Sequence, residues 1–165
     1  MGHLNATVEL IRTKDLQKYL TGLSDQADFI VEKLQSFLSA KFDSSPLEIL
    51  CMGKWSGHEL GIKSDLDFVF ISDEPATQNQ VKMARRLINL LTSHSSAGRL
   101  YDIDLRLKPN QSAGPLIIEK EKLYDFLNGK AEAWQKLAYL RSRLLGSQKP
   151  VMREMFSSLK LTSAD

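Results

Sequence analysis

The stretch LEILCMGKWSGHELGIKSDLDFVFI, residues 47–71, decides the fold class of this chain of 165 residues. The apolar run from Leu47 to Met52 follows Pro46 and predicts a short buried strand. A second run, residues 66–71, is rich in Phe, Val and Ile, which is typical of a strand. The residues between the two runs contain three glycines and indicate a loop. The segment therefore predicts two neighbouring strands joined by a glycine-rich turn.

Helical patterns surround this pair of strands. Apolar residues recur at helical spacing through residues 27–38, and Ser24 stands in the position of an N-cap. A weaker helical pattern covers residues 4–20. Beyond the second strand, Thr77 and Gln80 have the spacing of a capping box and precede an apolar helical stripe. The sequence therefore predicts helices before and after the strand pair.

The second half of the chain alternates between strand and helix patterns. Residues 101–107 predict a third strand and residues 116–118 a short fourth. Helical patterns return after that, with Trp134 and Leu137 on one apolar stripe. The order of elements predicts an α+β fold, a small mixed β-sheet flanked by helices, with N- and C-terminal helices. We expect a single domain, 1–165, with helices at 1–42, the sheet that carries the site at 43–119 and C-terminal helices at 120–165.

Composition and charge exclude several classes of protein. Hydrophobic residues make up 42% of the chain and charged residues 25%, which is ordinary for a protein that folds in water. The net charge of +2 argues against nucleic acid as a partner. No apolar stretch approaches the roughly 20 residues that span a bilayer, and residues 1–13 lack the pattern of a signal peptide. The single cysteine, Cys51, predicts a buried structural thiol, and these features together favour a cytoplasmic protein without a membrane contact.

Acidic side chains gather on two of the predicted strands. Asp65 and Asp67 are two residues apart, so their carboxylates point to the same face of a strand. Their neighbours Leu66, Phe68 and Phe70 point to the opposite face and can anchor the core. On the third strand Asp102, Asp104 and Arg106 share one face. Carboxylates this close repel one another unless a cation neutralises them, and Mg²⁺ prefers such oxygen ligands. The pattern is compatible with a magnesium site, although an Asp-x-Asp pair taken alone is more often two solvated aspartates.

The glycine-rich turn ahead of the aspartates favours the interpretation as a metal and phosphate site. Gly53, Ser56 and Gly57 supply flexible backbone. Their amides, together with the Ser56 hydroxyl, can hold a phosphate group, and Lys54 or Lys63 can add positive charge. A plain turn is the alternative interpretation of these glycines.

Four segments, in order, resemble one enzyme family. GKWSGHEL (53–60) followed by SDLD (64–67) resembles the glutamine synthetase adenylyltransferases, also called glutamate–ammonia-ligase adenylyltransferases. The resemblance continues through YDIDLRLKP (101–109), SAGP (112–115) and the stretch from Trp134 to Gly146. It covers about residues 49–146 and implies the DNA polymerase β-like nucleotidyltransferase fold. The sequence departs from the family at Ser56, where a second glycine is usual.

The resemblance implies roles for individual residues. Asp65 and Asp67 match the metal-binding pair, and Asp104 matches the third catalytic acid and metal ligand. The strand pattern alone leaves Asp102 and Asp104 as alternatives for that third position. The residues implied to hold the nucleotide are Gly53, Lys54, Ser56, Gly57 and Arg106. Three further residues match basic positions of the family: Lys108, Arg141 and Arg143.

The activity implied by the resemblance is transfer of AMP from ATP to a tyrosine of glutamine synthetase, by a mechanism with two Mg²⁺ ions. The implied partners are ATP, glutamine synthetase and, through domains outside this sequence, a PII-type signalling protein. Glu59-Leu60-Gly61 and the approach to the third strand favour the adenylylating domain of the family. The alternatives are phosphorolytic removal of AMP, a superfamily relative with another acceptor, and a non-catalytic nucleotide-binding domain. The helical domain that normally follows is largely absent after Gly146, so we expect either a fragment of a longer chain or a small stand-alone relative.

Overall fold

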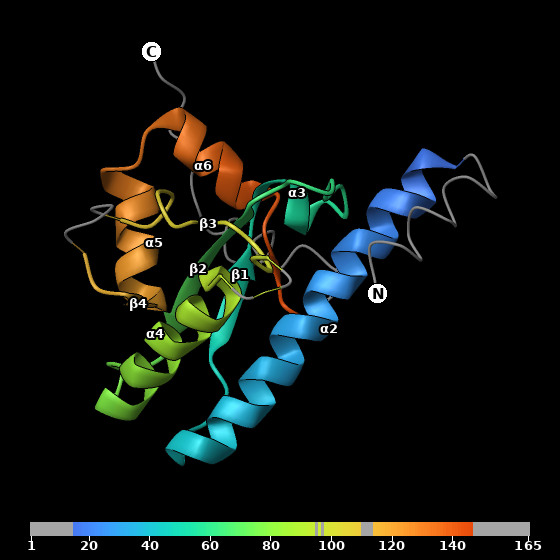
Figure 1. Cartoon of the computed structure of the whole chain (residues 1–165). Coiled ribbons are helices and arrows are strands. Elements are labelled where there is room, and N and C mark those ends of the chain that lie inside the picture. The colour runs from blue at the N-terminus through green and yellow to red at the C-terminus, as the bar shows by residue number, and fades with distance from the viewer. Residues whose placement is uncertain (1–14, 95, 97, 110–113, 147–165) are drawn as a thin grey trace.

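A mixed β-sheet with helices on both faces makes up the described part of the chain, as a computed structural model shows (Figure 1). The structure describes residues 15–94, 96, 98–109 and 114–146. The elements, in chain order, are α2 (Leu16–Phe42), β1 (Glu48–Cys51), α3 (Gly53–Ser56), β2 (Leu66–Ser72), α4 (Gln78–Thr92), β3 (Ile103–Asp104), β4 (Ile117–Glu119), α5 (Lys120–Gly129), α6 (Ala133–Leu140) and β5 (Arg143–Leu144). This arrangement confirms the predicted α+β class with a small mixed sheet between helices.

The sheet is organised around β2. This strand pairs with β1 in antiparallel register, where Ile49 lies opposite Phe70, and β1 pairs with β5 on its other side. Both β3 and β4 run parallel to β2; β3 pairs with the first residues of β2 and β4 with its last. The start of β2 therefore meets β3 at one end of the sheet, and that end carries Asp67 and Asp104.

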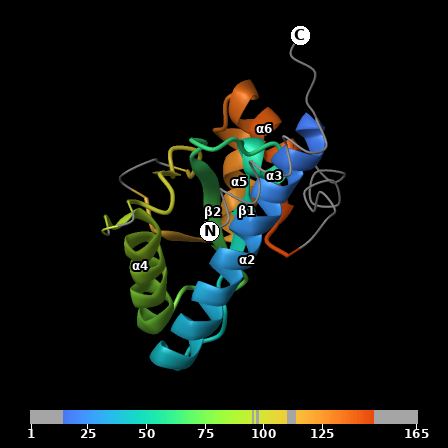
Figure 2. The ribbon, with the colours of Figure 1, turned by 45° about the vertical axis from the view of Figure 1, so that its right-hand side comes forward.

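The two faces of the sheet carry separate apolar cores (Figures 1 and 2). One face packs against α2 and α4, and the other packs against α5 and α6. In the first core, the Phe68 ring contacts the rings of Trp55 and Phe70 edge to face, with centroid distances of 5.9 and 5.1 Å. Such aromatic pairs stabilise a core beyond the area that they bury.

The alternation of β2 decides which side chains each face receives. The residues beneath α2 and α4 are those that the sequence predicted for the core: Leu66, Phe68 and Phe70. Val69 and Ile71 lie in the second core, and Asp67 precedes them with the same period of two. The Asp67 carboxylate therefore points to the α5–α6 side, at the end of a covered face and not on an open, solvated sheet.

Helix α2 begins earlier than the N-cap predicted at Ser24. Its N-cap is Asp15, whose side chain accepts a hydrogen bond from the Lys18 amide. The predicted N-cap, Ser24, is wrong: it lies buried within α2. The Ser24 hydroxyl donates to the Leu20 carbonyl at 3.0 Å and accepts from the Leu60 amide at 3.2 Å. Ser24 therefore connects the segment before β2, through Leu60, to helix α2 by a hydrogen bond.

Other boundaries differ from the sequence-based ones in smaller ways. The capping box of Thr77 and Gln80 is present at the start of α4, as predicted. The glycine-rich turn contains the one-turn helix α3, and the third strand is only two residues long. The predicted apolar stripe through Trp134 is wrong, because that side chain is exposed and α6 buries Tyr139 instead. Predictions for residues before 15 and after 146 lie outside the described part of the chain.

The structure also bears on the single cysteine and on membrane-spanning helices. Cys51 is buried in β1, and burial raises the pKa of its thiol, so it is the structural thiol that the sequence predicted. Across the ranges that the structure describes, no helix combines the length and the apolar character needed to cross a bilayer.

Candidate functional site

Asp67 and Asp104 are partners in the parallel pairing of β2 with β3. Asp65 comes immediately before β2. Burial raises the pKa of Asp67, and the charges of Asp104 and Asp65 raise it further. The three acidic residues singled out in the sequence therefore influence one another electrostatically at one end of the sheet. A group of like charges of this kind favours a bound cation.

Arg106 holds the Asp104 carboxylate. Its Nε lies 3.0 and 2.8 Å from the two oxygens of Asp104, and its Nη2 lies 2.5 Å from Oδ2. The Arg106 amide also donates to Asp104 Oδ1 at 2.8 Å. These hydrogen bonds keep the pKa of Asp104 below its usual value. Arg106 itself is largely exposed, so its guanidinium can move away when another cation arrives.

The structure separates the two candidates for the third acidic position. Asp102 is exposed and pairs with Arg99, on the approach to β3. Its backbone carbonyl accepts from the Leu66 amide at 2.9 Å, which helps to align the start of β2. The Asp104 side chain lies beside Asp67 across the strand pair, and both line the same cleft. The geometry therefore favours Asp104 as the third member of the group.

The glycine-rich turn lies directly on Asp67. Gly53 has a φ of +54°, a left-handed conformation that side chains other than hydrogen disfavour. A Cβ atom at Gly53 would lie 2.2 Å from Oδ2 of Asp67, which no real contact permits. The Met52 amide donates to the Asp67 carbonyl at 2.8 Å just before this turn. Only glycine therefore allows the turn and the carboxylate to approach this closely.

The other residues of the turn differ in burial and in the groups that they contact. Ser56 is buried, and its hydroxyl donates to the Gly53 carbonyl at 2.9 Å, so it stabilises the turn from within. Lys54 is exposed and close enough to Asp67 to act against the rise of its pKa. A Cβ atom at Gly57 would lie 3.2 Å from Nη2 of Arg141. The turn is thus bordered by two cations, Lys54 and Arg141, which suit a phosphate chain.

A buried polar network fixes the turn to the rest of the fold. Asp28 of α2 accepts hydrogen bonds from Trp55 Nε1 at 2.7 Å and from Arg143 Nη2 at 2.8 Å. Arg143 Nη2 also lies 3.2 Å from the Trp55 carbonyl. Trp55 belongs to α3 and Arg143 to β5, so one carboxylate joins three elements. The sequence offered no sign of this network, because its members are up to 115 residues apart.

The basic positions of the sequence therefore fall into two groups. Arg143 is buried in this network, and the buried Lys108 donates from Nζ to the carbonyls of Gly114 and Pro115. Arg106 and Arg141 remain exposed near the acidic group and the turn. Arg143 and Lys108 stabilise the fold around the site, whereas the exposed pair can meet a ligand.

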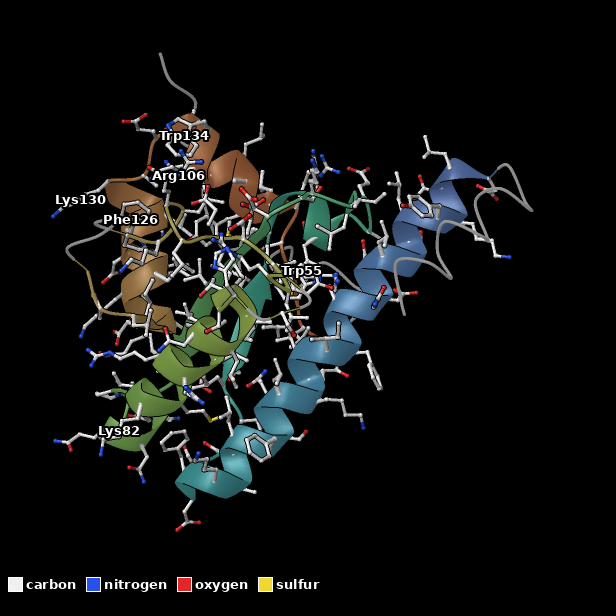
Figure 3. All side chains as sticks on the ribbon, in the orientation of Figure 1. Trp55, Lys82, Arg106, Phe126, Lys130 and Trp134 are labelled. Carbon is white, nitrogen blue, oxygen red and sulfur yellow. The ribbon has the colours of Figure 1, made fainter. Side chains whose placement is uncertain are left out.

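An open cleft of about 350 Å³ lies beside the acidic group, lined by Asp67, Asp104, Arg106, Leu107 and Trp134. Figure 3 shows the labelled Arg106 and Trp134 close to each other at the end of the sheet where α6 lies. The volume of this cleft is in the range of small-molecule sites. The cleft therefore combines charged groups with two apolar side chains, Leu107 and Trp134. Neither of them was expected as a site residue from the sequence.

The donor set suits a hard divalent cation, although the described residues hold no ready-made cage. No three His, Cys, Asp or Glu side chains within the described ranges are arranged closely enough to hold an ion. Both oxygens of Asp104 are engaged by Arg106, so a cation would replace that contact. The raised pKa of Asp67 comes first from burial and then from the charges of Asp104 and Asp65, and a bound cation would offset those charges. Oxygen donors in this setting fit Mg²⁺.

Replacing Gly53 with alanine tests the contact between the turn and Asp67. The added methyl group must displace either the Asp67 carboxylate or the turn, and the positive φ adds strain. We expect Gly53→Ala to lower the free energy of unfolding by about 1–3 kcal/mol, measured by urea denaturation.

The matched control is Gly22→Ala in α2. Gly22 is exposed, and a Cβ atom there meets nothing within 4 Å. This change should raise the free energy of unfolding by up to about 1 kcal/mol, because alanine favours a helix. If both variants had the stability of the wild type, Gly53 would not be the point of close approach described here.

Comparisons with known proteins point in one direction. The sequence profile of the family described as glutamate-ammonia ligase adenylyltransferase matches residues 6–157. Several relatives carry the name bifunctional glutamine synthetase adenylyltransferase/adenylyl-removing enzyme. The protein of Ralstonia nicotianae is 34% identical over 92% of this chain and 18% of its own length. The protein of Burkholderia mallei is 37% identical over 75% of this chain and 15% of its own length. The protein of Mannheimia succiniciproducens is 35% identical over 66% of this chain and 12% of its own length. The chain thus spans less than a fifth of each of these relatives.

Proposed function

Because the chain belongs to the glutamate-ammonia ligase adenylyltransferase family, we propose that its site transfers AMP from ATP to a tyrosine of glutamine synthetase. The observation that carries this proposal is the pairing of Asp67 with Asp104 at the mouth of a cleft, with the Gly53 turn against Asp67. Nucleotidyl transfer needs such a place, where the phosphate charge is neutralised and the reacting groups are held in line.

We assign the metal ligands to Asp65, Asp67 and Asp104. Bound Mg²⁺, in two ions if the site is filled as in other two-metal enzymes, would neutralise the phosphate charge. The fit rests on the oxygen donors and on the raised pKa of Asp67. We propose further that residues 1–165 act as a single nucleotidyltransferase domain.

The chain's own residues then account for binding and orientation. The turn that begins at Gly53 would receive the triphosphate, with Lys54 on one side and Arg141 beside Gly57 on the other. Arg106 would turn from Asp104 to the phosphate, since both are anions and its side chain is exposed. Ser56 contributes through the shape of the turn, because its hydroxyl is bonded to the Gly53 carbonyl.

The reaction itself balances in one displacement. The tyrosine oxygen attacks the α-phosphorus of ATP, the bond to the bridging oxygen of the β-phosphate breaks, and pyrophosphate leaves. Once Arg106 has turned to the phosphate, the Asp104 carboxylate is free to accept the hydroxyl proton. Catalysis consists mainly of holding the reactants in line and stabilising the charge that develops.

A second direction has support from the relatives, whose names include an adenylyl-removing activity. In that direction an oxygen of inorganic phosphate attacks the phosphorus of the tyrosine-bound AMP, the bond from that phosphorus to the tyrosine oxygen breaks, the tyrosine oxygen takes up a proton, and ADP is released. The two directions share the same acidic group and differ in products. Phosphorolytic removal of AMP is therefore the alternative reaction that the assay must distinguish from transfer. Regulation by a PII-type protein and a cytoplasmic location stay predictions.

An isotope assay tests the proposal. The chain is incubated with Mg²⁺, ATP labelled at the α-phosphate, and glutamine synthetase. We expect label on glutamine synthetase and release of pyrophosphate, and loss of both in Asp104→Asn. Phosphate-dependent release of ADP from adenylylated glutamine synthetase would instead identify the removing reaction. Equal labelling by the wild type and Asp104→Asn would contradict the assignment.

A further inference from the structure

Trp134 is an exposed aromatic side chain at the candidate site. It is 52% exposed, lies on α6, and lines the cleft together with Asp67, Asp104, Arg106 and Leu107. Tryptophan is on average one of the most buried residue types, so an exposed indole at the edge of a charged cleft is informative. The chain's other tryptophan, Trp55, is fully buried in the core.

One hydrogen bond orients the indole. Its Nε1 donates to Glu132 Oε2 at 2.6 Å. Glu132 is also the N-cap of α6 and forms a capping box with Gln135, whose side chain accepts from the Glu132 amide at 3.0 Å. The carboxylate that begins the helix therefore also positions the ring. An aromatic surface oriented in advance loses little entropy when a flat ligand stacks on it.

A second hydrogen bond ties the other apolar lining residue, Leu107, to the same helix. The Tyr139 hydroxyl donates to the Leu107 carbonyl at 2.9 Å, which ties the segment after β3 to α6. Tyr139 is itself buried in the second core. The lining of the cleft thus divides into two apolar side chains, Leu107 and Trp134, and three charged ones, Asp67, Asp104 and Arg106. A ligand that matches this division has a flat apolar part joined to an anionic part.

We infer that Trp134 is the stacking platform for the purine base of the nucleotide, whose phosphates meet the acidic group and the Gly53 turn. This inference rests on the proposed function, because it takes the anionic part to be the triphosphate. Stacking uses the flat face of the base and no hydrogen-bonding pattern, so Trp134 favours purines over pyrimidines because they have the larger surface.

Calorimetric titration in the presence of Mg²⁺ tests this assignment with ATP, GTP, UTP and inorganic triphosphate as probes. We expect Trp134→Leu to weaken the binding of ATP and GTP by about ten-fold or more. The affinity for inorganic triphosphate should not change, and UTP should be affected less than ATP. Trp134→Phe, which keeps an aromatic face, should recover most of the affinity for ATP.

Leu137→Ala provides the matched control on the same helix. Leu137 is 65% exposed and does not line the cleft, so the affinity for all four probes should stay at the wild-type value. Equal ATP affinity in Trp134→Leu and the wild type would overturn the inference. So would a loss of AMP transfer in both Trp134→Leu and Leu137→Ala with unchanged ATP affinity, because that result would mark α6 as a protein-docking surface.

The two proposals fail in different ways. If the chain binds ATP through Trp134 and transfers no AMP to any protein, the inference stands and the proposed reaction is wrong. If AMP transfer is present and Trp134→Leu leaves the affinity for ATP unchanged, the reaction stands and the platform is wrong. Binding and transfer are measured separately, so each result decides one proposal.

Discussion

Asp67→Asn is expected to abolish AMP transfer and to leave the unliganded fold as stable as the wild type or more stable. The loss of activity should be at least about 10²–10³-fold, the size of effect seen when one preorganised electrostatic group is removed from an active site. Stability should not fall, because burial and the charges of Asp104 and Asp65 raise the pKa of Asp67 above its usual value. Asparagine keeps the shape of the side chain without that charge.

The sign of the stability effect depends on pH. A carboxyl group whose pKa is raised by folding destabilises the native state once it ionises, as the pH rises above the usual aspartate range. The advantage of Asp67→Asn should therefore be present at neutral pH and disappear as the pH falls below that range. Thermal unfolding in a metal chelator, from pH 3 to pH 8, measures this. Asp125→Asn, an exposed change on α5, serves as the control and should alter neither activity nor stability. A lower stability of Asp67→Asn at neutral pH would show that the carboxylate is already neutralised by the fold.

Arg143→Met should produce the largest loss of stability. It leaves the Asp28 carboxylate in a buried position without its cation, while Trp55 still donates to it. Breaking such a buried pair typically lowers the free energy of unfolding by about 3–5 kcal/mol. For a chain of this length, that corresponds to a fall in Tm of about 6–20 °C. AMP transfer should fall as well, because the network holds α3 and the turn that lies on Asp67.

A second variant separates the charge effect from the loss of packing. Asp28→Asn combined with Arg143→Met removes both charges and keeps an acceptor for Trp55, so it should recover part of the lost stability. Arg86→Met, on the exposed side of α4, should stay within about 0.5 kcal/mol of the wild type. If the effects of the two single substitutions simply added in the double variant, Asp28 and Arg143 would not be coupled as the structure indicates.

Local patterns in the sequence predicted the parts of the fold that depend on neighbours along the chain. The alternation in residues 66–71 placed Phe68 and Phe70 in the core, and the spacing of Thr77 and Gln80 predicted the capping box of α4. The same alternation placed Asp67 on the opposite face of β2 from these aromatic residues. These features need only the periods of helix and strand, which sequence displays directly.

Contacts between distant segments could not be predicted in this way. Serine is a residue type that often caps helices, but Ser24 lies inside α2. Its hydroxyl accepts a hydrogen bond from the Leu60 amide instead. Arg143 matched a basic family position, but only the packing of β5 beside β1 brings it to Asp28. The choice between Asp102 and Asp104 likewise required the register of β3 against β2. Local propensity leaves such tertiary contacts undetermined.

The most direct test of the central claim measures divalent metal at the acidic group, with Mn²⁺ as a spectroscopic substitute for Mg²⁺. Free Mn²⁺ is followed by electron paramagnetic resonance while the chain is titrated in the presence of a non-hydrolysable ATP analogue. The wild type should bind Mn²⁺ saturably, and Asp67→Asn and Asp104→Asn should each abolish that binding while remaining folded. Mn²⁺ binding of equal strength in the wild type and both variants would contradict a shared metal site at Asp65, Asp67 and Asp104.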